Sequence, residues 1–258
     1  MIRDAAAGVV ASLWRYPVKS MQGEPLEEAR FEAAGISGDR AYAVIEPASG
    51  RVASAKSERW AKLLECRARY AVPSGEGGPP SDLEIELAGG ERLRAGAPDL
   101  DARLSRALGV GAAALDGPRP ADPQFDAAPV HLITSASLER LAAICRLPAL
   151  DERRFRPNVV VATCEGLRGF VEQDWIGRTI ALGEEVRLRI ESACERCAMT
   201  LLPQPGLARE PRVFETVRRR RRRLLRRLRV GGGGRARALR GPRAAPVARD
   251  RRAPGAMT

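Results

Sequence analysis

The chain has 258 residues, of which 44% are hydrophobic and 4% aromatic, so it is long enough for one large or two modest domains with an aliphatic core. Its five cysteines lack the paired spacings of a disulfide framework, and no apolar run approaches the ~20 residues of a membrane span. The first residues lack the long apolar core of a signal peptide, so we expect a cytoplasmic protein.

The formal net charge of +12 belongs to the end of the chain. Residues 218–258 contain 16 Arg and one Asp, a net charge of +15, which leaves −3 for residues 1–217. The basic balance therefore does not predict a body that binds nucleic acid. The segment 218–258 has no aromatic residue and includes four consecutive glycines, so it offers little apolar surface to bury and we expect it to be disordered.

Short apolar and alternating runs predict a β-rich first part. Hairpin turns are expected at Ser49-Gly50 and Gly89-Gly90. One helix is expected over 99–108, where three leucines at helical spacing precede Gly109. Strands are expected at 8–14, in the region 29–46 and in the runs around 63–72 and 82–94.

A Pro-rich connector at 117–129 suggests a domain boundary. After it, the sequence predicts a short strand and then a helix whose cap is Ser135 or Ser137. Residues 153–163 are expected to form a basic turn followed by a buried strand, and residues 177–193 a hairpin. The fold class is thus mainly β with some α, divided into residues 1–120, residues 126–217 and a basic tail at 218–258.

Two thiols, Cys194 and Cys197, follow the alternating run that ends the second part, with Arg196 between them. The cation favours a thiolate, which is a soft metal ligand or a nucleophile. A structural zinc site would need further ligands, but the remaining cysteines form no second pair and His131 is the single histidine. Two inert buried thiols are the simplest alternative.

Basic and amide side chains beside turns are a second group of candidates. Lys19-Ser20 follows a proline, Arg40 follows Gly38-Asp39, and Arg156-Pro157-Asn158 precedes a buried strand. Such groups can hold a phosphate, although most of them are simply solvated or structural. There is no P-loop, no dinucleotide-binding glycine motif and no GxSxG elbow in the sequence.

Four segments in this order resemble the MOSC-domain family, which includes amidoxime-reducing components and the C-terminal domain of molybdenum cofactor sulfurase. They are LWRYPVKSMQGEPL, AGISGDRAYAVI, RFRPNVVV and CERCAMTLLPQPGL, and the resemblance covers roughly residues 8–217. It implies an N-terminal MOSC-type β-rich subdomain at 1–120 and a MOSC β-barrel at 126–217, with a molybdenum–molybdopterin cofactor between them.

The resemblance also implies roles for individual residues. Cys197 matches the catalytic cysteine that ligates molybdenum, and Cys194 matches a companion of undefined role. The residues that match the cofactor-binding positions are Lys19, Ser20, Arg40, Thr134, Ser135, Arg156 and Asn158. Pyridoxal phosphate binding is a further property that family membership implies.

The chain departs from the family pattern after the last motif. Leu201 stands where the family usually has a second threonine, and the Arg-rich tail replaces a Gly and aromatic segment followed by a strand pair that helps to close the barrel. The tail uses residues with GC-rich codons, and we interpret it as out-of-frame translation of the original ending, which predicts an incomplete barrel. A natural disordered tail or a basic arm for nucleic acid or anionic membrane are the other interpretations.

The function that the resemblance implies is a molybdenum oxidoreductase that reduces N-hydroxylated small molecules. The sequence has no iron–sulfur cluster pattern, so we expect electrons from a separate flavin or iron–sulfur reductase, and we expect neither a membrane nor a specific nucleic-acid partner. The alternatives are a sulfur carrier with a persulfide on Cys197 and a non-catalytic cofactor-binding protein.

Overall fold

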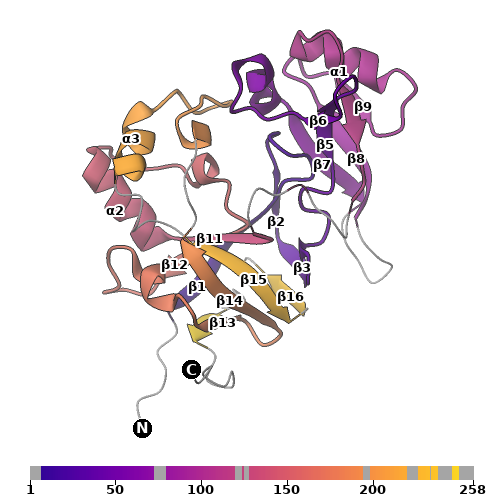
Figure 1. Ribbon diagram of the computed structural model, residues 1–258. Coiled ribbons are helices and arrows are strands. Elements are labelled where there is room, and N and C mark those ends of the chain that lie inside the picture. The colour runs from indigo at the N-terminus through magenta and orange to yellow at the C-terminus, as the bar shows by residue number, and fades with distance from the viewer. Residues whose placement is uncertain are drawn as a thin grey trace.

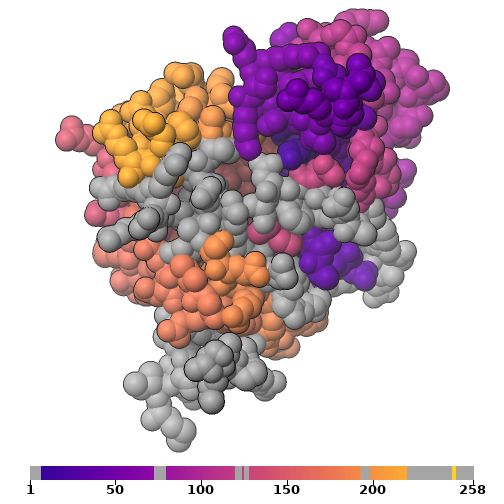
Figure 2. All heavy atoms as spheres, viewed as in Figure 1, coloured from indigo at the N-terminus to yellow at the C-terminus, as the bar shows by residue number. Residues whose placement is uncertain are grey.

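The computed structural model describes a mixed fold of sheets and short helices (Figure 1). The described residues are 7–72, 80–119, 124, 128–193, 198–219, 226–232, 234–237 and 246–249. Residues from about 43 to 116 form most of a lobe at the upper right, whereas β1, β2 and the elements after residue 128 build a second body around a large sheet. The space-filling view shows the indigo-to-magenta lobe beside the orange segments of the second body (Figure 2).

The large sheet has eight strands in the order β12-β11-β15-β14-β13-β17-β1-β2, and β12 also pairs with β1. Seven strands therefore form a closed ring, from which β2 extends as an eighth. All pairs are antiparallel except β11–β12. The strands are β1 (Gly8–Arg15), β2 (Glu24–Leu26), β11 (Val130–Thr134), β12 (Val159–Thr163), β13 (Thr179–Leu182), β14 (Val186–Ala193), β15 (Arg226–Gly232) and β17 (Pro246–Arg249).

The barrel strands bury one face in the core, because alternate residues along them are apolar. Val186, Leu188 and Ile190 of β14 are fully buried, while Arg187 and Arg189 between them are not. This is the period-two pattern of a strand with one buried face, and it confirms the strand expected before the two cysteines. Val10, Leu13, Leu132, Val159, Ile180 and Val247 complete much of the same core.

Three small sheets accompany the barrel. The lobe contains β5 (Ala43–Glu46), β6 (Arg51–Val52), η1 (Glu58–Glu65), β7 (Arg67–Val72), β8 (Ser81–Glu86), β9 (Arg92–Arg94), α1 (Leu100–Leu108) and β10 (Ala114–Asp116). The third sheet joins β3 (Glu28–Glu32), β4 (Gly35–Ile36) and β16 (Gly234–Arg237). The expected helix is confirmed, with Leu100, Leu104 and Leu108 buried and Gly109 closing it at φ 70°.

Helices α2 (Ser135–Cys145) and α3 (Pro211–Arg219) cover one side of the barrel. Short 3₁₀ turns lie nearby, namely η2 (Glu152–Phe155), η3 (Val171–Trp175) and η4 (Ala198–Thr200). The cap of α2 is Thr134, whose hydroxyl accepts from Ser137 N at 3.1 Å, and not Ser135 or Ser137 as the sequence predicts. Thr134 has the extended backbone that a cap needs, while Ser135 is already helical.

The structure differs from the expected disordered tail at three places. β15 lies between β11 and β14, β17 lies between β13 and β1, and β16 pairs with β3. Two strands of the barrel therefore come from beyond Val217, where the sequence predicts that the barrel ends. Leu228 and Val230 alternate with Arg in β15, and two neighbouring strand edges supply its backbone partners.

Candidate functional site

The loop after β1 lies alongside the segment that carries Arg40. Arg40 N donates to Tyr16 O at 2.8 Å, Tyr42 N donates to Pro17 O at 3.0 Å, and Lys19 N donates to Tyr42 O at 2.9 Å. These backbone bonds join the first two sequence motifs. They fix Tyr16 and Arg40 next to each other.

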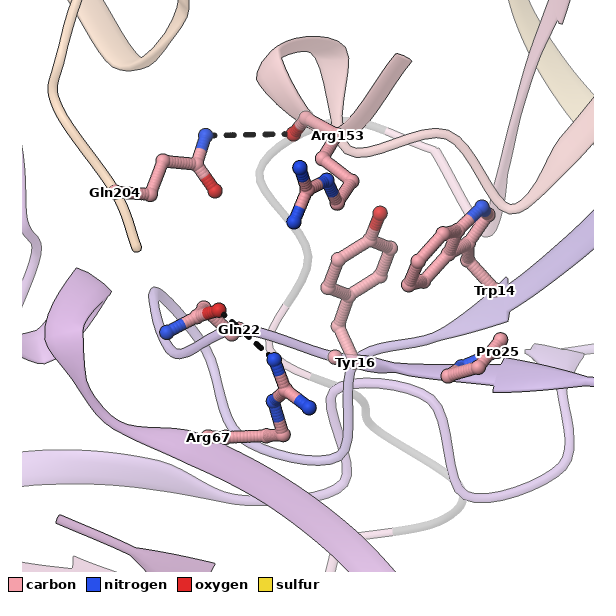
Figure 3. Close-up of a pocket in the computed structure, with 8 residues that line it drawn as sticks. Trp14, Tyr16, Gln22, Pro25, Arg67, Arg153 and Gln204 are labelled. Atoms are coloured by element: carbon pink, nitrogen blue, oxygen red, sulfur yellow. Dashed lines mark hydrogen bonds between the residues drawn. The ribbon is translucent and has the colours of Figure 1, made fainter. Parts of the chain in front are cut away.

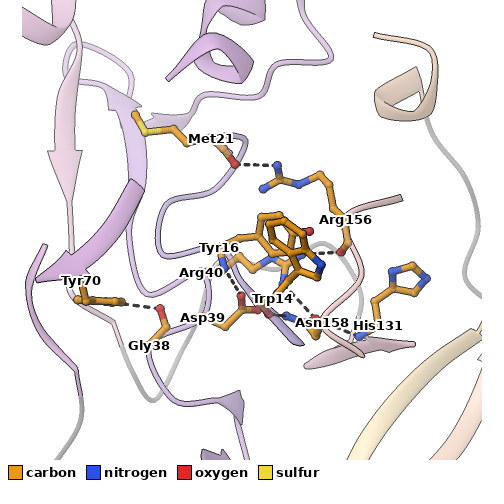
Figure 4. Close-up of polar contacts among 10 residues, drawn as sticks. All are labelled: Trp14, Tyr16, Met21, Gly38, Asp39, Arg40, Tyr70, His131, Arg156 and Asn158. Carbon is orange, nitrogen blue, oxygen red and sulfur yellow. Dashed lines mark hydrogen bonds and ion pairs between the residues drawn. The ribbon is translucent and has the colours of Figure 1, made fainter. Parts of the chain in front are cut away.

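Two guanidinium groups stack on the ring of Tyr16 (Figure 4). The Cζ atom of Arg40 lies 4.6 Å from the ring centroid and that of Arg156 lies 4.2 Å from it. Arg156 also donates to Met21 O at 2.7 Å, and Arg40 forms an ion pair with the neighbouring carboxylate of Asp39. Cation–π contacts of this kind hold both cations in place at one position.

Asn158 connects this cation pair to the barrel. Its Oδ1 accepts from Arg40 Nη1 and from His131 N, both at 3.1 Å, and its Nδ2 donates to Trp14 O at 3.2 Å. The residue is 1% exposed, so its amide is committed to these partners. The structure thus brings Arg40, Arg156 and Asn158 together from both halves of the chain.

Three of the predicted cofactor-binding residues have a left-handed backbone. The φ angles are 67° at Ser20, 49° at Arg40 and 51° at Arg156, and among the described non-glycine residues only Asp82 and Arg146 share this feature. Each such conformation costs on the order of 1 kcal/mol in a non-glycine residue. Strained residues of this kind gather at ligand sites more often than elsewhere.

Lys19 and Ser20 belong to the same loop after β1. The Ser20 hydroxyl is buried and accepts from Ala55 N at 3.2 Å, so it also holds the chain that follows β6. Lys19 is half-buried. No hydrogen bond among the described contacts joins either side chain to the pair of guanidinium groups.

Thr134 and Ser135 use their hydroxyls to hold α2. Thr134 Oγ1 donates to the fully buried carboxylate of Glu172 at 2.8 Å, and Ser137 Oγ donates to the same carboxylate at 2.6 Å. Ser135 Oγ accepts from Thr163 N at 3.1 Å. These contacts explain both hydroxyls as parts of the helix start.

Thr134 stands three residues along β11 from His131, which is about 10 Å at the rise of a strand. His131 O accepts from Asn158 N at 2.7 Å, whereas Thr134 pairs with Val161. The contacts therefore do not bring Thr134 and Ser135 into the cluster around Tyr16. They place them at the other end of the same strand.

Cys194 and Cys197 lie outside the described residues, but both flanks of their segment are placed. Ala193 ends β14 and pairs with Arg226, which in turn pairs with Leu132 beside Val159. On the other flank, η4 contacts η2, and Met199 is buried in the lobe core that contains Val18 and Met21. Among the residues that the structure describes, no group of three His, Cys, Asp or Glu side chains could hold a metal ion.

Burial raises the pKa of the Tyr16 hydroxyl well above its ordinary value, even though the cations Arg156 and Arg40 act in the opposite direction. The group is therefore a neutral donor at physiological pH. Sequence reasoning passed over Tyr16 and Asp39, although both stand inside quoted motifs, directly before Pro17 and directly before Arg40. Asp39 also accepts from Tyr16 N at 2.7 Å.

The chain matches two domain models of one protein family. Residues 7–113 match the MOSC N-terminal beta barrel domain and residues 114–241 match the MOSC domain, so the chain belongs to the MOSC-domain family. The fold, a β-rich lobe beside a barrel, agrees with the architecture expected from the sequence.

Among particular proteins, the chain is similar to mitochondrial amidoxime-reducing component 1. Identity with the Homo sapiens protein is 26% over 82% of this chain and 71% of that protein. With the Xenopus laevis protein it is 33% over 36% of this chain, so the matched segment spans a quarter of that relative. The YUAD protein from Bacillus subtilis, a solved structure, is 12% identical with a TM-score of 0.48 over 93% of each chain. No helix in the described part of the chain is both long and apolar enough to cross a membrane.

Proposed function

We propose that this MOSC-family protein binds a molybdenum–molybdopterin cofactor and reduces N-hydroxylated small molecules. The observation that carries the proposal is the cluster around Tyr16, in which Arg40 from the first half of the chain meets Arg156 and Asn158 from the second. Two fixed cations suit an anionic ligand such as a pterin phosphate, and the amide of Asn158 orients one of them.

In this proposal the two halves of the chain hold different parts of the cofactor. Arg40 and Arg156 neutralise its phosphate, and Asn158 keeps Arg40 oriented through their 3.1 Å bond. Lys19 and Ser20 contribute from the loop after β1. Thr134 and Ser135 take part through the backbone amides at the start of α2, because their hydroxyls already bond to other residues.

Cys197 is the proposed metal ligand, since a thiolate is a soft donor suited to molybdenum. Support comes from the flanks of its segment, because β14 ends in the same row of the sheet as Leu132 and Val159, and Met199 packs in the core that contains Met21. When bound, the cofactor supplies the two-electron redox chemistry. The protein orients the substrate and excludes water.

The overall reaction balances as the loss of one oxygen atom. A substrate N–OH group takes up two electrons and two protons, its N–O bond breaks, and the products are N–H and water. The electrons come from a separate flavin or iron–sulfur reductase. The cofactor site alone supports the wider class of molybdenum oxidoreductases. We choose N-hydroxylated substrates because the chain is similar to amidoxime-reducing components.

The test measures molybdenum by mass spectrometry and pterin by fluorescence in purified protein. Arg40→Gln removes one charge-assisted contact, worth about 1.5–3 kcal/mol, so we expect pterin retention to fall about 10–100-fold. Arg94→Gln, whose side chain is 79% exposed, is the control and should retain wild-type content. Equal pterin content in Arg40→Gln and wild type would refute the site.

Cys197→Ala separates the metal from the pterin. We expect this variant to lose reduction of an N-hydroxylated amidine by chemically supplied electrons while it keeps most of its pterin. Full activity would refute the ligand assignment. A mass increase of one sulfur on Cys197 that reductant removes, in protein without molybdenum, would identify a sulfur carrier instead.

A further inference from the structure

A small cavity opens on the hydroxyl side of Tyr16, next to the cation cluster (Figure 3). Its volume is about 140 Å³, close to that of a cavity able to hold one benzene molecule. Its wall is formed by β1, the loop after β1, β2, β7, η2 and the segment after η4. The lining residues are Trp14, Tyr16, Gln22, Gly23, Pro25, Arg67, Arg153 and Gln204.

The Tyr16 hydroxyl is a buried polar atom without a partner among the described residues. The residue is only 3% exposed, and its ring is fixed by the stacked guanidinium groups. Figure 3 shows the hydroxyl pointing along the cavity toward Arg153. A buried hydroxyl without a hydrogen-bond partner is unfavourable, so a ligand that accepts its hydrogen bond is stabilised at this position.

Two arginines bring positive charge to the wall. Arg67 and Arg153 both line the cavity, and no carboxylate does so among the described lining residues. Arg153 is held by Asp151, whose carboxylate accepts from Nη2 at 2.7 Å and from Nε at 2.9 Å. Arg67 is an exposed residue, so its charge stands where the cavity meets solvent.

Flat apolar groups form the remaining wall. The indole of Trp14 is held by a 2.7 Å bond from its Nε1 to Glu152, and Pro25 lies on the same side of the cavity in Figure 3. Gly23 lets the loop approach this closely, because a Cβ there would lie 2.6 Å from Tyr16 Cδ1. The cavity is thus narrow and walled by rings.

We propose that this cavity binds a small planar carboxylate, a ring-bearing anion of the size of benzoate. The carboxylate accepts from the Tyr16 hydroxyl and meets the guanidinium of Arg153, the ring lies against Trp14 and Pro25, and Arg67 attracts the anion at the mouth. The site is separate from the proposed cofactor contacts of Arg40 and Arg156, and its occupation needs neither molybdenum nor pterin.

The experiment measures benzoate binding to the purified full chain by ligand-observed NMR, with neutral benzamide as the matched probe. We expect benzamide to bind about tenfold more weakly than benzoate, because it lacks the charge that both arginines recognise. We expect Tyr16→Phe, which keeps the ring and removes only the hydroxyl, to weaken benzoate about fivefold.

Arg67→Gln provides a second variant at an exposed position, where the fold tolerates the change, and should weaken benzoate severalfold. Arg94→Gln on the same small sheet removes an equal charge away from the cavity and should leave binding unchanged. Equal affinity for benzoate and benzamide, or unchanged benzoate binding in both Tyr16→Phe and Arg67→Gln, overturns the proposal, as does no saturable binding of benzoate. Because no turnover is measured, failure here is distinct from failure of the cofactor assignment.

Discussion

Replacing Thr134 with valine tests whether this hydroxyl stabilises the helix start on which α2 depends. Valine keeps the shape and suits the extended backbone at this position, so the change removes only hydrogen bonds. Loss of the cap to Ser137 N costs about 1 kcal/mol. Loss of the donor to the buried Glu172 carboxylate costs about 1.5–3 kcal/mol, although Ser137 still donates to it. We expect a total loss of about 3 kcal/mol.

Urea unfolding followed by far-UV circular dichroism measures this loss. The m-value, which is the slope of the unfolding free energy against urea concentration, should stay unchanged. In a chain of this size the midpoint of thermal unfolding should fall by about 6–12 °C. Ser135→Ala is the control, because its partly buried neutral bonds to Thr163 are worth about 1 kcal/mol. A loss below about 0.5 kcal/mol for Thr134→Val would refute the structural role of this hydroxyl.

Three further predictions concern other parts of the chain. Gly23→Ala should destabilise the protein by about 1–3 kcal/mol, measured by urea unfolding, because its Cβ would collide with Arg15 O and the Tyr16 ring; an unchanged midpoint would contradict the close approach. Burial raises the pKa of the Cys66 thiol from 9.0 to about 11. The neutral thiol therefore stabilises the folded state fully below pH 9, and this stabilisation is lost as the pH rises to about 11. Between about pH 8 and pH 11 the wild type should therefore lose about 2–3 kcal/mol more unfolding free energy than Cys66→Ala, and parallel curves would exclude this contribution. Sequencing the gene tests the frame interpretation of the tail: an alternative frame after the codon for Val217 should encode the missing strand pair, and its absence from both other frames rejects the interpretation.

Local patterns predicted most of the elements whose partners are close in sequence. The alternating run 186–190 and the leucines of α1 are examples, because a strand or helix period appears directly in the residue types. The strands after Val217 were missed because composition alone predicted disorder. Their backbone partners are β1, β3, β11, β13 and β14, which lie far away in the sequence and leave no local signal.

The candidate site was predictable only in part. Resemblance to a family singled out Arg40, Arg156 and Asn158, and the structure shows that they meet. The central position of Tyr16 could not be read from its motif, because an aromatic residue before Pro17 reads equally well as core. Its environment depends on two arginines that lie far apart in the chain, so only the fold reveals it.

Closure of the barrel through β1 and β17 has a consequence for how the protein is made. Gly8 pairs with Val247, so β1 must wait until residues 246–249 have been synthesised before one of its neighbours exists. Contacts of such long sequence separation form slowly, and until then the edge of β1 stays open to pairing with other nascent chains. Yield during expression should therefore depend on chaperone supply and on the speed of translation through the arginine codons between residues 218 and 243.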